Sequence, residues 1–154
     1  MTLTPFGRFV FVAQWIMALA LPIWVLGGRG ILGVELGWMG VVGLFYAPIA
    51  IIALLAPAFT SLFDVEVRKA KTSRAGYSIA MTAGWAAMFL MGFVLPDAND
   101  DRALPSAFSK WFGIDEQVSS MLTTVCFFAA VAALLTALVL AIIGVQHSRK
   151  TAAA

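Results

Sequence analysis

Hydrophobic positions gather in four long stretches that contain no Asp, Glu, Lys or Arg, over residues 9–28, 36–63, 75–96 and 117–148. A helix needs about 20 predominantly apolar residues to cross the hydrocarbon core of a bilayer, and each stretch reaches that length. The pattern therefore predicts four transmembrane helices over about 9–27, 38–62, 76–95 and 117–146, in a single transmembrane domain that occupies residues 1–154.

The apolar stretches are continuous, as in Ala47–Ala58 and Phe127–Leu135. Strands of a membrane barrel would alternate apolar and polar residues, and a helix satisfies every backbone hydrogen bond within itself. The predicted fold class is therefore an all-α integral membrane protein, a four-transmembrane-helix bundle. Composition agrees, because 62% of the residues are hydrophobic and 12% are charged, against roughly 25% charged in soluble domains.

Charges between the apolar stretches predict the orientation. Short cytoplasmic connections of membrane proteins carry an excess of Lys and Arg. The second connection is basic, the C-terminal tail carries Arg149 and Lys150, and the connection over residues 97–116 is mainly acidic. We therefore expect an N-in/C-in topology, with both termini in the cytoplasm. The many alanines and few lysines favour a bacterium of high genomic GC content, so the predicted location is the bacterial inner membrane.

Two connections have features of their own. The first, Gly27–Gly37, is short and glycine-rich, which predicts a tight link between antiparallel helices. In the third, Ser106 can cap a helix and Gly113 can terminate it, so we expect a short helix lying in the outer interface.

The third connection also begins with Asp97, Asn99 and Asp101, a spacing found at the start of calcium-binding loops. The glycine and the glutamate that such loops need later are replaced by Arg102 and Phe108. We therefore interpret this segment as a solvated acidic turn and predict no metal site.

Small residues mark where helices can approach one another, because lipid tails are as apolar as leucine and close packing drives association in membranes. The fourth stretch has an alanine at every fourth position, and the second has glycine and alanine three and four apart. The predicted contacts with another helix or a partner are Ala129, Ala133, Ala137, Ala141, Gly40, Gly43 and Ala47. Gln14, inside the first stretch, also needs a partner, because an unpaired amide in hydrocarbon is costly. The same seven positions and Gln14 can serve contacts within the chain or between chains.

The sequence carries no motif that specifies a reaction. Every Asp, Glu, Lys and Arg lies outside the centre of a predicted helix, and the chain has one histidine, His147, and one cysteine, Cys126. We therefore predict no catalytic residues and no cofactor. The net charge of +2 comes from basic residues at helix ends, so we predict no nucleic-acid partner. The basic connection can instead contact anionic lipid headgroups through Arg68, Lys69, Lys71 and Arg74.

These features favour a non-catalytic protein, an accessory or assembly subunit of a larger membrane complex, whose partners are the lipid bilayer and either other membrane subunits or itself. The alternative is a small self-associating transporter or channel. That alternative rests on Gln14, on an acidic outer vestibule formed by the third connection, and on Pro22, Pro48 and Pro57. These prolines lie inside or near the ends of predicted helices and are either structural bends or hinges.

Overall fold

The computed structural model describes the backbone of residues 5–153 and the side chains up to residue 150. Within that part, four helices are long and apolar enough to cross a membrane: α1 (Pro5–Ile31), α2 (Trp38–Ser61), α4 (Ala75–Val94) and α6 (Glu116–Ala153). The prediction of a mostly helical chain with four helices long and apolar enough to span a membrane is thereby confirmed. The predicted ends of the second and third spans lie within one residue of those of α2 and α4.

The first and last spans are longer than predicted. The sequence predicted a first span over residues 9–27, between Arg8 and Arg29. The helix α1 instead includes both arginines. A charge near a helix end does not stop a helix when its side chain reaches water or a partner. α6 has 38 residues, which correspond to about 57 Å at about 1.5 Å per residue, nearly twice the core thickness of about 30 Å.

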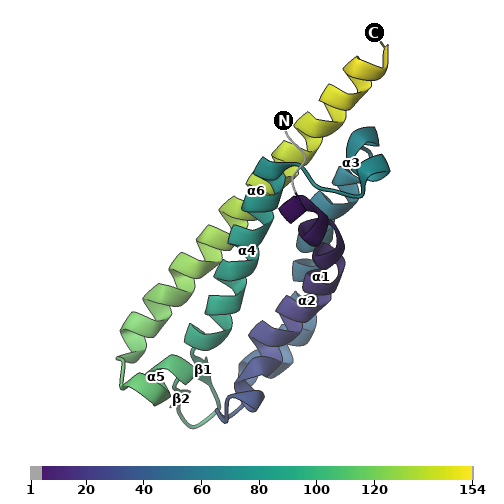
Figure 1. The fold of residues 1–154 in the computed structure, drawn as a ribbon. Coiled ribbons are helices and arrows are strands. Elements are labelled where there is room, and N and C mark those ends of the chain that lie inside the picture. Colours follow the sequence, from purple (N-terminus) through teal and green to yellow (C-terminus); the bar gives the residue numbers. More distant parts are fainter. Residues whose placement is uncertain (1–4, 154) are drawn as a thin grey trace.

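The four long helices form an elongated bundle (Figure 1). α1 packs against α2 and α4, and α6 packs against the same two helices, so α1 and α6 lie diagonally across the bundle. α1 and α4 run in one direction, and α2 and α6 run in the other. We call the end that contains α3 the α3 end and the opposite one the α5 end. The C-terminal part of α6 extends beyond the other helices at the α3 end (Figure 1).

Short elements close both ends. At the α3 end, α3 (Val65–Ala70) begins at Asp64, whose side chain accepts hydrogen bonds from two backbone N–H groups of its first turn. At the α5 end, β1 (Asp97–Ala98) pairs antiparallel with β2 (Ala103–Leu104), and α5 (Ala107–Phe112) follows. Ser106 caps α5 and Gly113 ends it in a left-handed conformation, at the two positions that the sequence indicated. Whether α5 lies in a membrane interface stays a prediction.

One apolar core runs along the bundle axis. Its fully buried members include Val10 and Ala18 of α1, Met81 of α4 and Ala137 of α6. α4 is the most central helix, with ten of its 20 residues buried, whereas α2 buries five of 24. α2 therefore turns most of its apolar surface outward, away from the bundle.

Candidate functional site

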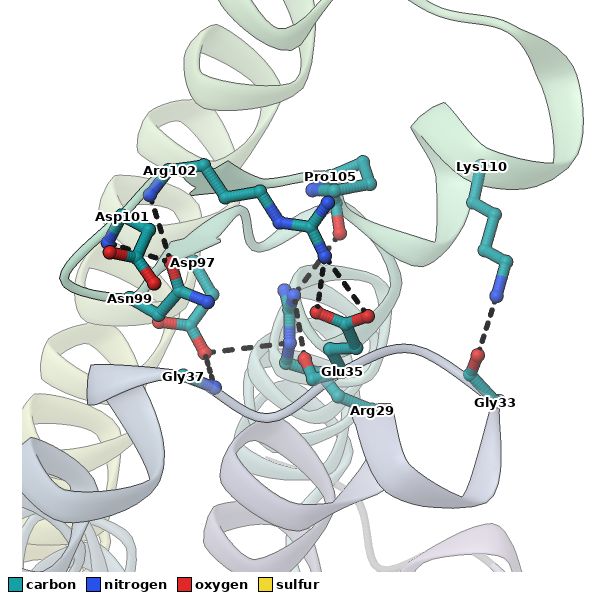
Figure 2. A network of polar contacts seen from close by, with 10 residues as sticks. All are labelled: Arg29, Gly33, Glu35, Gly37, Asp97, Asn99, Asp101, Arg102, Pro105 and Lys110. Atoms are coloured by element: carbon teal, nitrogen blue, oxygen red, sulfur yellow. Dashed lines mark hydrogen bonds and ion pairs between the residues drawn. The ribbon is translucent and has the colours of Figure 1, made fainter.

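A buried polar cluster lies at the α5 end and is centred on Arg29 and Asp97 (Figure 2). The guanidinium of Arg29 is 1% exposed and donates hydrogen bonds to the backbone carbonyls of Leu95, Pro105 and Glu35. Its Nε lies 3.7 Å from Oδ2 of Asp97, a carboxylate that is itself fully buried. We call this group the α5-end cluster.

The burial of Arg29 was not predicted. The sequence placed it in a loop, but α1 extends to Ile31 and the loop is correspondingly shorter. Leu95 is the C-terminal cap of α4, so its carbonyl has no acceptor role within the helix and is available to Arg29. One side chain at the end of α1 thus joins the end of α4 to the segment before α5.

The prediction of a solvated acidic turn is wrong for Asp97. Its carboxylate accepts hydrogen bonds from the backbone N–H groups of Gly37, Met39 and Ala98. Gly37 is the N-cap of α2 and has no capping side chain of its own, so Asp97 caps α2 from another part of the chain. Asp100 and Asp101 in the same turn are exposed, and Asn99 closes the turn by accepting from two backbone N–H groups (Figure 2).

Two exposed contacts surround this cluster. Arg102 forms an ion pair of 2.9 Å with Glu35, and both side chains are more than 60% exposed. Nζ of Lys110, on α5, donates to the carbonyl of Gly33, 2.6 Å away (Figure 2). An ammonium group has three donors, so among the described residues two donors of Lys110 remain open to other acceptors.

A second polar cluster, the α3-end cluster, is centred on Arg74 and Asp64. Nε of Arg74 lies 2.6 Å from Oδ2 of Asp64, and a second nitrogen of the same guanidinium lies 2.8 Å from Glu66. α6 covers the pair with Gly144, where a Cβ would lie 2.8 Å from the Asp64 carboxylate. A cavity of about 10 Å³, the size of one water molecule, adjoins the pair, and the buried hydroxyl of Ser73 lines it.

Arg74 is therefore not a lipid contact, and that prediction is wrong. The side chain is 4% exposed, and its hydrogen bond to Asp64 holds its pKa above the ordinary value even though burial acts against the charge. The other three predicted lipid contacts, Arg68, Lys69 and Lys71, are exposed on α3 and at its C-terminal cap. Their binding of headgroups stays a prediction.

Gln14 lies between the two clusters, inside the bundle. It is fully buried, and its Oε1 accepts a hydrogen bond of 2.7 Å from the hydroxyl of Tyr77 on α4. Nε2 of the same amide has no partner among the described residues. The structure thus places Gln14 in a contact between α1 and α4.

The alanine series of α6 is only partly a contact face. Ala137 and Ala141 are buried against the rest of the bundle, and Ala133 lies near Gly84 of α4, where an added Cβ would be 3.5 Å away. Ala129 is exposed, so it is open to lipid or to a partner. The buried register also includes Ala130, which the every-fourth-residue pattern left out.

The small residues of α2 also differ from one another. Gly43 is buried, and a Cβ there would lie 2.6 Å from the side chain of Leu26, so the glycine permits the close approach of α1 and α2. A Cβ at Gly40 would meet nothing within 4 Å, and Ala47 is partly exposed. Of these three positions, Gly43 is the one at which the described residues show a close contact between helices. Of the helix prolines, Pro22 and Pro57 are buried and Pro48 is exposed.

A lateral hollow of about 640 Å³ opens between α1 and α4 in the half of the bundle nearer the α5 end. Every residue that lines it is apolar or glycine, and the hollow was not predicted because its walls come from two separate helices. We call it the α1/α4 hollow, and its main lining residues are Ala20, Trp24, Gly27, Trp85, Ala86 and Phe89.

No group of three or more His, Cys, Asp or Glu side chains that could hold a metal ion occurs among the described residues. Comparison of the chain with protein-family models, with curated proteins and with solved structures finds no match. Any functional inference therefore rests on the arrangement of the residues themselves.

Proposed function

We propose that the chain is a non-catalytic accessory or assembly subunit of a larger membrane complex in the bacterial inner membrane, oriented with both termini in the cytoplasm. The observation that carries this proposal is the use of its buried charged groups. Arg29 and Asp97 bind backbone groups that end neighbouring segments, and Arg74 binds Asp64. These groups fix helices to one another, which is a structural role.

A transporter that alternates between two open states needs helices that separate at one end and then at the other. Here Arg29 joins α1 to the Leu95 carbonyl at the end of α4. Near the other end, the N–H of Ser73, just before α4, donates to the Gly7 carbonyl of α1, 3.0 Å away. Between them lies the Gln14–Tyr77 hydrogen bond. These contacts favour a bundle that holds one shape.

Partners would meet the outward faces of α2 and α6. Phe45 of α2 is 75% exposed and Phe128 of α6 is 64% exposed, and each belongs to a row of large apolar side chains on its helix. A photo-crosslinking phenylalanine analogue at either position should capture a different membrane protein in cells. The analogue at Leu54, which is 1% exposed, is the matched control and should capture nothing. Crosslinks between copies of this chain alone would favour the self-associating transporter or channel.

Water access to position 14 separates the two functions. In a Cys126→Ser background, Gln14→Cys should stay unreactive toward a small hydrophilic thiol reagent, because the native side chain is fully buried. Rapid labelling that changes when candidate solutes are added would overturn the subunit proposal in favour of transport.

The orientation is supported by the charges at the two ends. Exposed Arg68, Lys69 and Lys71 lie at the α3 end, whereas exposed Asp100 and Asp101 lie at the α5 end. Cysteines that replace the exposed Ala70 and Ala98, again without Cys126, should react with an impermeant reagent from opposite sides. Ala70→Cys should be the protected one in intact cells, and labelling of both from outside would contradict the topology.

A further inference from the structure

We propose that the α1/α4 hollow binds one acyl chain of an anionic phospholipid, whose phosphate is held by Lys110 at the α5 end. The inference concerns the lipid leaflet on that side of the bundle and does not depend on the proposed function. It rests on the length of the hollow, on where it is closed, and on the charge at its mouth.

The length of the hollow fits a lipid chain. On α1 its lining runs from Met17 to Ile31, which is about 21 Å at about 1.5 Å per residue. One leaflet with its headgroup region contributes about half of a bilayer that is about 40–45 Å thick. A transmembrane helix of a partner would need a groove along the full thickness, so the hollow fits a chain that stays within one leaflet.

The hollow is closed towards the α3 end. There α1 and α4 are held together by the Gln14–Tyr77 hydrogen bond and by the fully buried Val10 and Met81. An occupant must therefore enter from the side or from the α5 end, which is how a phospholipid with its headgroup at that surface would lie.

Lys110 lies at the open mouth. Its Nζ donates to the carbonyl of Gly33, two residues beyond the lining residue Ile31. The neighbouring Trp111 ring is 6.2 Å from that of Phe93, which in turn contacts the Trp24 ring of the hollow wall at 5.1 Å. The mouth thus combines two groups that suit a phospholipid. The half-exposed indole of Trp111 suits the lipid interface, and the Lys110 ammonium has two open donors for a phosphate.

The proposal is tested by native mass spectrometry of the purified full chain with added phosphatidylglycerol or phosphatidylcholine of identical acyl chains. Wild-type protein should retain phosphatidylglycerol several-fold better. Ala86→Leu, which narrows the hollow, should lower the retention of both lipids several-fold. Ala83→Leu, at an exposed position of the same helix outside the hollow, is the matched control and should change neither.

The headgroup contact has its own pair of variants. Lys110→Gln should remove most of the preference for phosphatidylglycerol while phosphatidylcholine is retained as before. Lys69→Gln, an exposed lysine at the α3 end, should leave the preference for the lipid in the hollow unchanged. Inorganic phosphate should not compete, because the acyl chain supplies most of the contact.

Three results would overturn the proposal. Equal lipid retention by Ala86→Leu and Ala83→Leu would show that the hollow holds no lipid. A protein that co-purifies and is lost in Ala86→Leu, with lipid retention unchanged, would assign the hollow to a partner helix. Equal loss of preference in Lys110→Gln and Lys69→Gln would place the headgroup elsewhere. If Ala86→Leu fails to fold, Ala20→Leu narrows the hollow from the opposite wall and decides the same question.

Discussion

The two ends of the bundle each bury one arginine beside one aspartate that caps a helix, but they use the arginine differently. Arg74 at the α3 end binds carboxylates, those of Asp64 and Glu66. Arg29 at the α5 end binds three backbone carbonyls and lies 3.7 Å from Asp97. The ion pairs of Arg74 join neighbours in sequence, whereas Arg29 also reaches Leu95 and Pro105, which are more than 60 residues away.

This difference separates local from global stabilisation. The α3-end cluster positions α3 and the start of α4 against Gly144 of α6, so its loss should loosen mainly that end of the bundle. The α5-end cluster connects α1, α4 and the hairpin that caps α2, so its loss should affect the whole bundle. A planar guanidinium suits the second role because its donors are fixed in direction and can reach several carbonyls at once.

The largest expected effect is therefore that of Arg29→Met. Removing the guanidinium leaves the buried Asp97 carboxylate and the buried Leu95 carbonyl without this partner, which should lower the free energy of unfolding by about 3–5 kcal/mol. Thermal unfolding in a mild detergent measures the change. Arg102→Gln, which breaks the exposed pair with Glu35, is the control and should cost less than about 1 kcal/mol. Similar losses for both variants would refute the central role of Arg29.

Arg74→Gln should have a smaller effect, about 2–3 kcal/mol, because Asp64 keeps its two backbone hydrogen bonds and Glu66 is 42% exposed. A raised folded-state pKa means that the contribution of Arg74 is fully present below its unfolded pKa and is lost only as the pH rises through the folded value. Arg74 therefore stays charged over the whole range from about pH 6 to about pH 8. Asp64→Asn preserves the cap of α3, and a double-mutant cycle with Arg74→Gln isolates the ion pair.

Between the two ends, helix packing should matter more than polar contacts. Ala137 is fully buried on α6, so Ala137→Leu should force helices apart and lower stability by about 1–3 kcal/mol. Ala129→Leu, in the same series but exposed, should change stability by no more than about 0.5 kcal/mol. Identical melting curves for the two variants would mean that α6 repacks at no cost and that its middle turns do not fix the bundle.

The smallest expected effect is that of Tyr77→Phe, which removes the hydrogen bond to Gln14. Interhelical hydrogen bonds in membranes contribute about 0.6 kcal/mol on average and at most about 1–2 kcal/mol. Chemical denaturation in detergent should resolve this loss against Tyr46→Phe, whose native side chain is 62% exposed. A loss as large as that of Arg29→Met would place the main polar contact of the bundle in its middle and would reverse the comparison.

The membrane-spanning helices were predictable because their signal is the length of an apolar stretch, which needs no knowledge of neighbours. α3 was also within reach of sequence analysis: Asp64 is a good N-cap, Glu66 follows in the first turn, and Arg68 and Lys69 come in the last. The basic charges of this segment were assigned to topology and lipid contact instead, and the pairing of Arg74 with Asp64 was missed.

The burial of Arg29 could not be predicted in the same way. An arginine at the end of an apolar stretch has the same local pattern whether it faces water or a set of carbonyls. Its partners, at Leu95 and Pro105, are backbone atoms whose residue types carry no signal for the contact. The α1/α4 hollow escaped prediction for a related reason, since it depends on how Ala20 and Ala86 face one another across two helices.

The position of Arg29 has a consequence for the order of assembly in the membrane. Chains are synthesised from the N-terminus, so α1 emerges before the carbonyls of Leu95 and Pro105 exist. Until α4 and the segment after it have been made, the guanidinium must stay hydrated at the bilayer surface, because an unpaired charge in hydrocarbon is costly. The α5 end therefore closes late, and α1 reaches its final depth and tilt only when α4 arrives beside it.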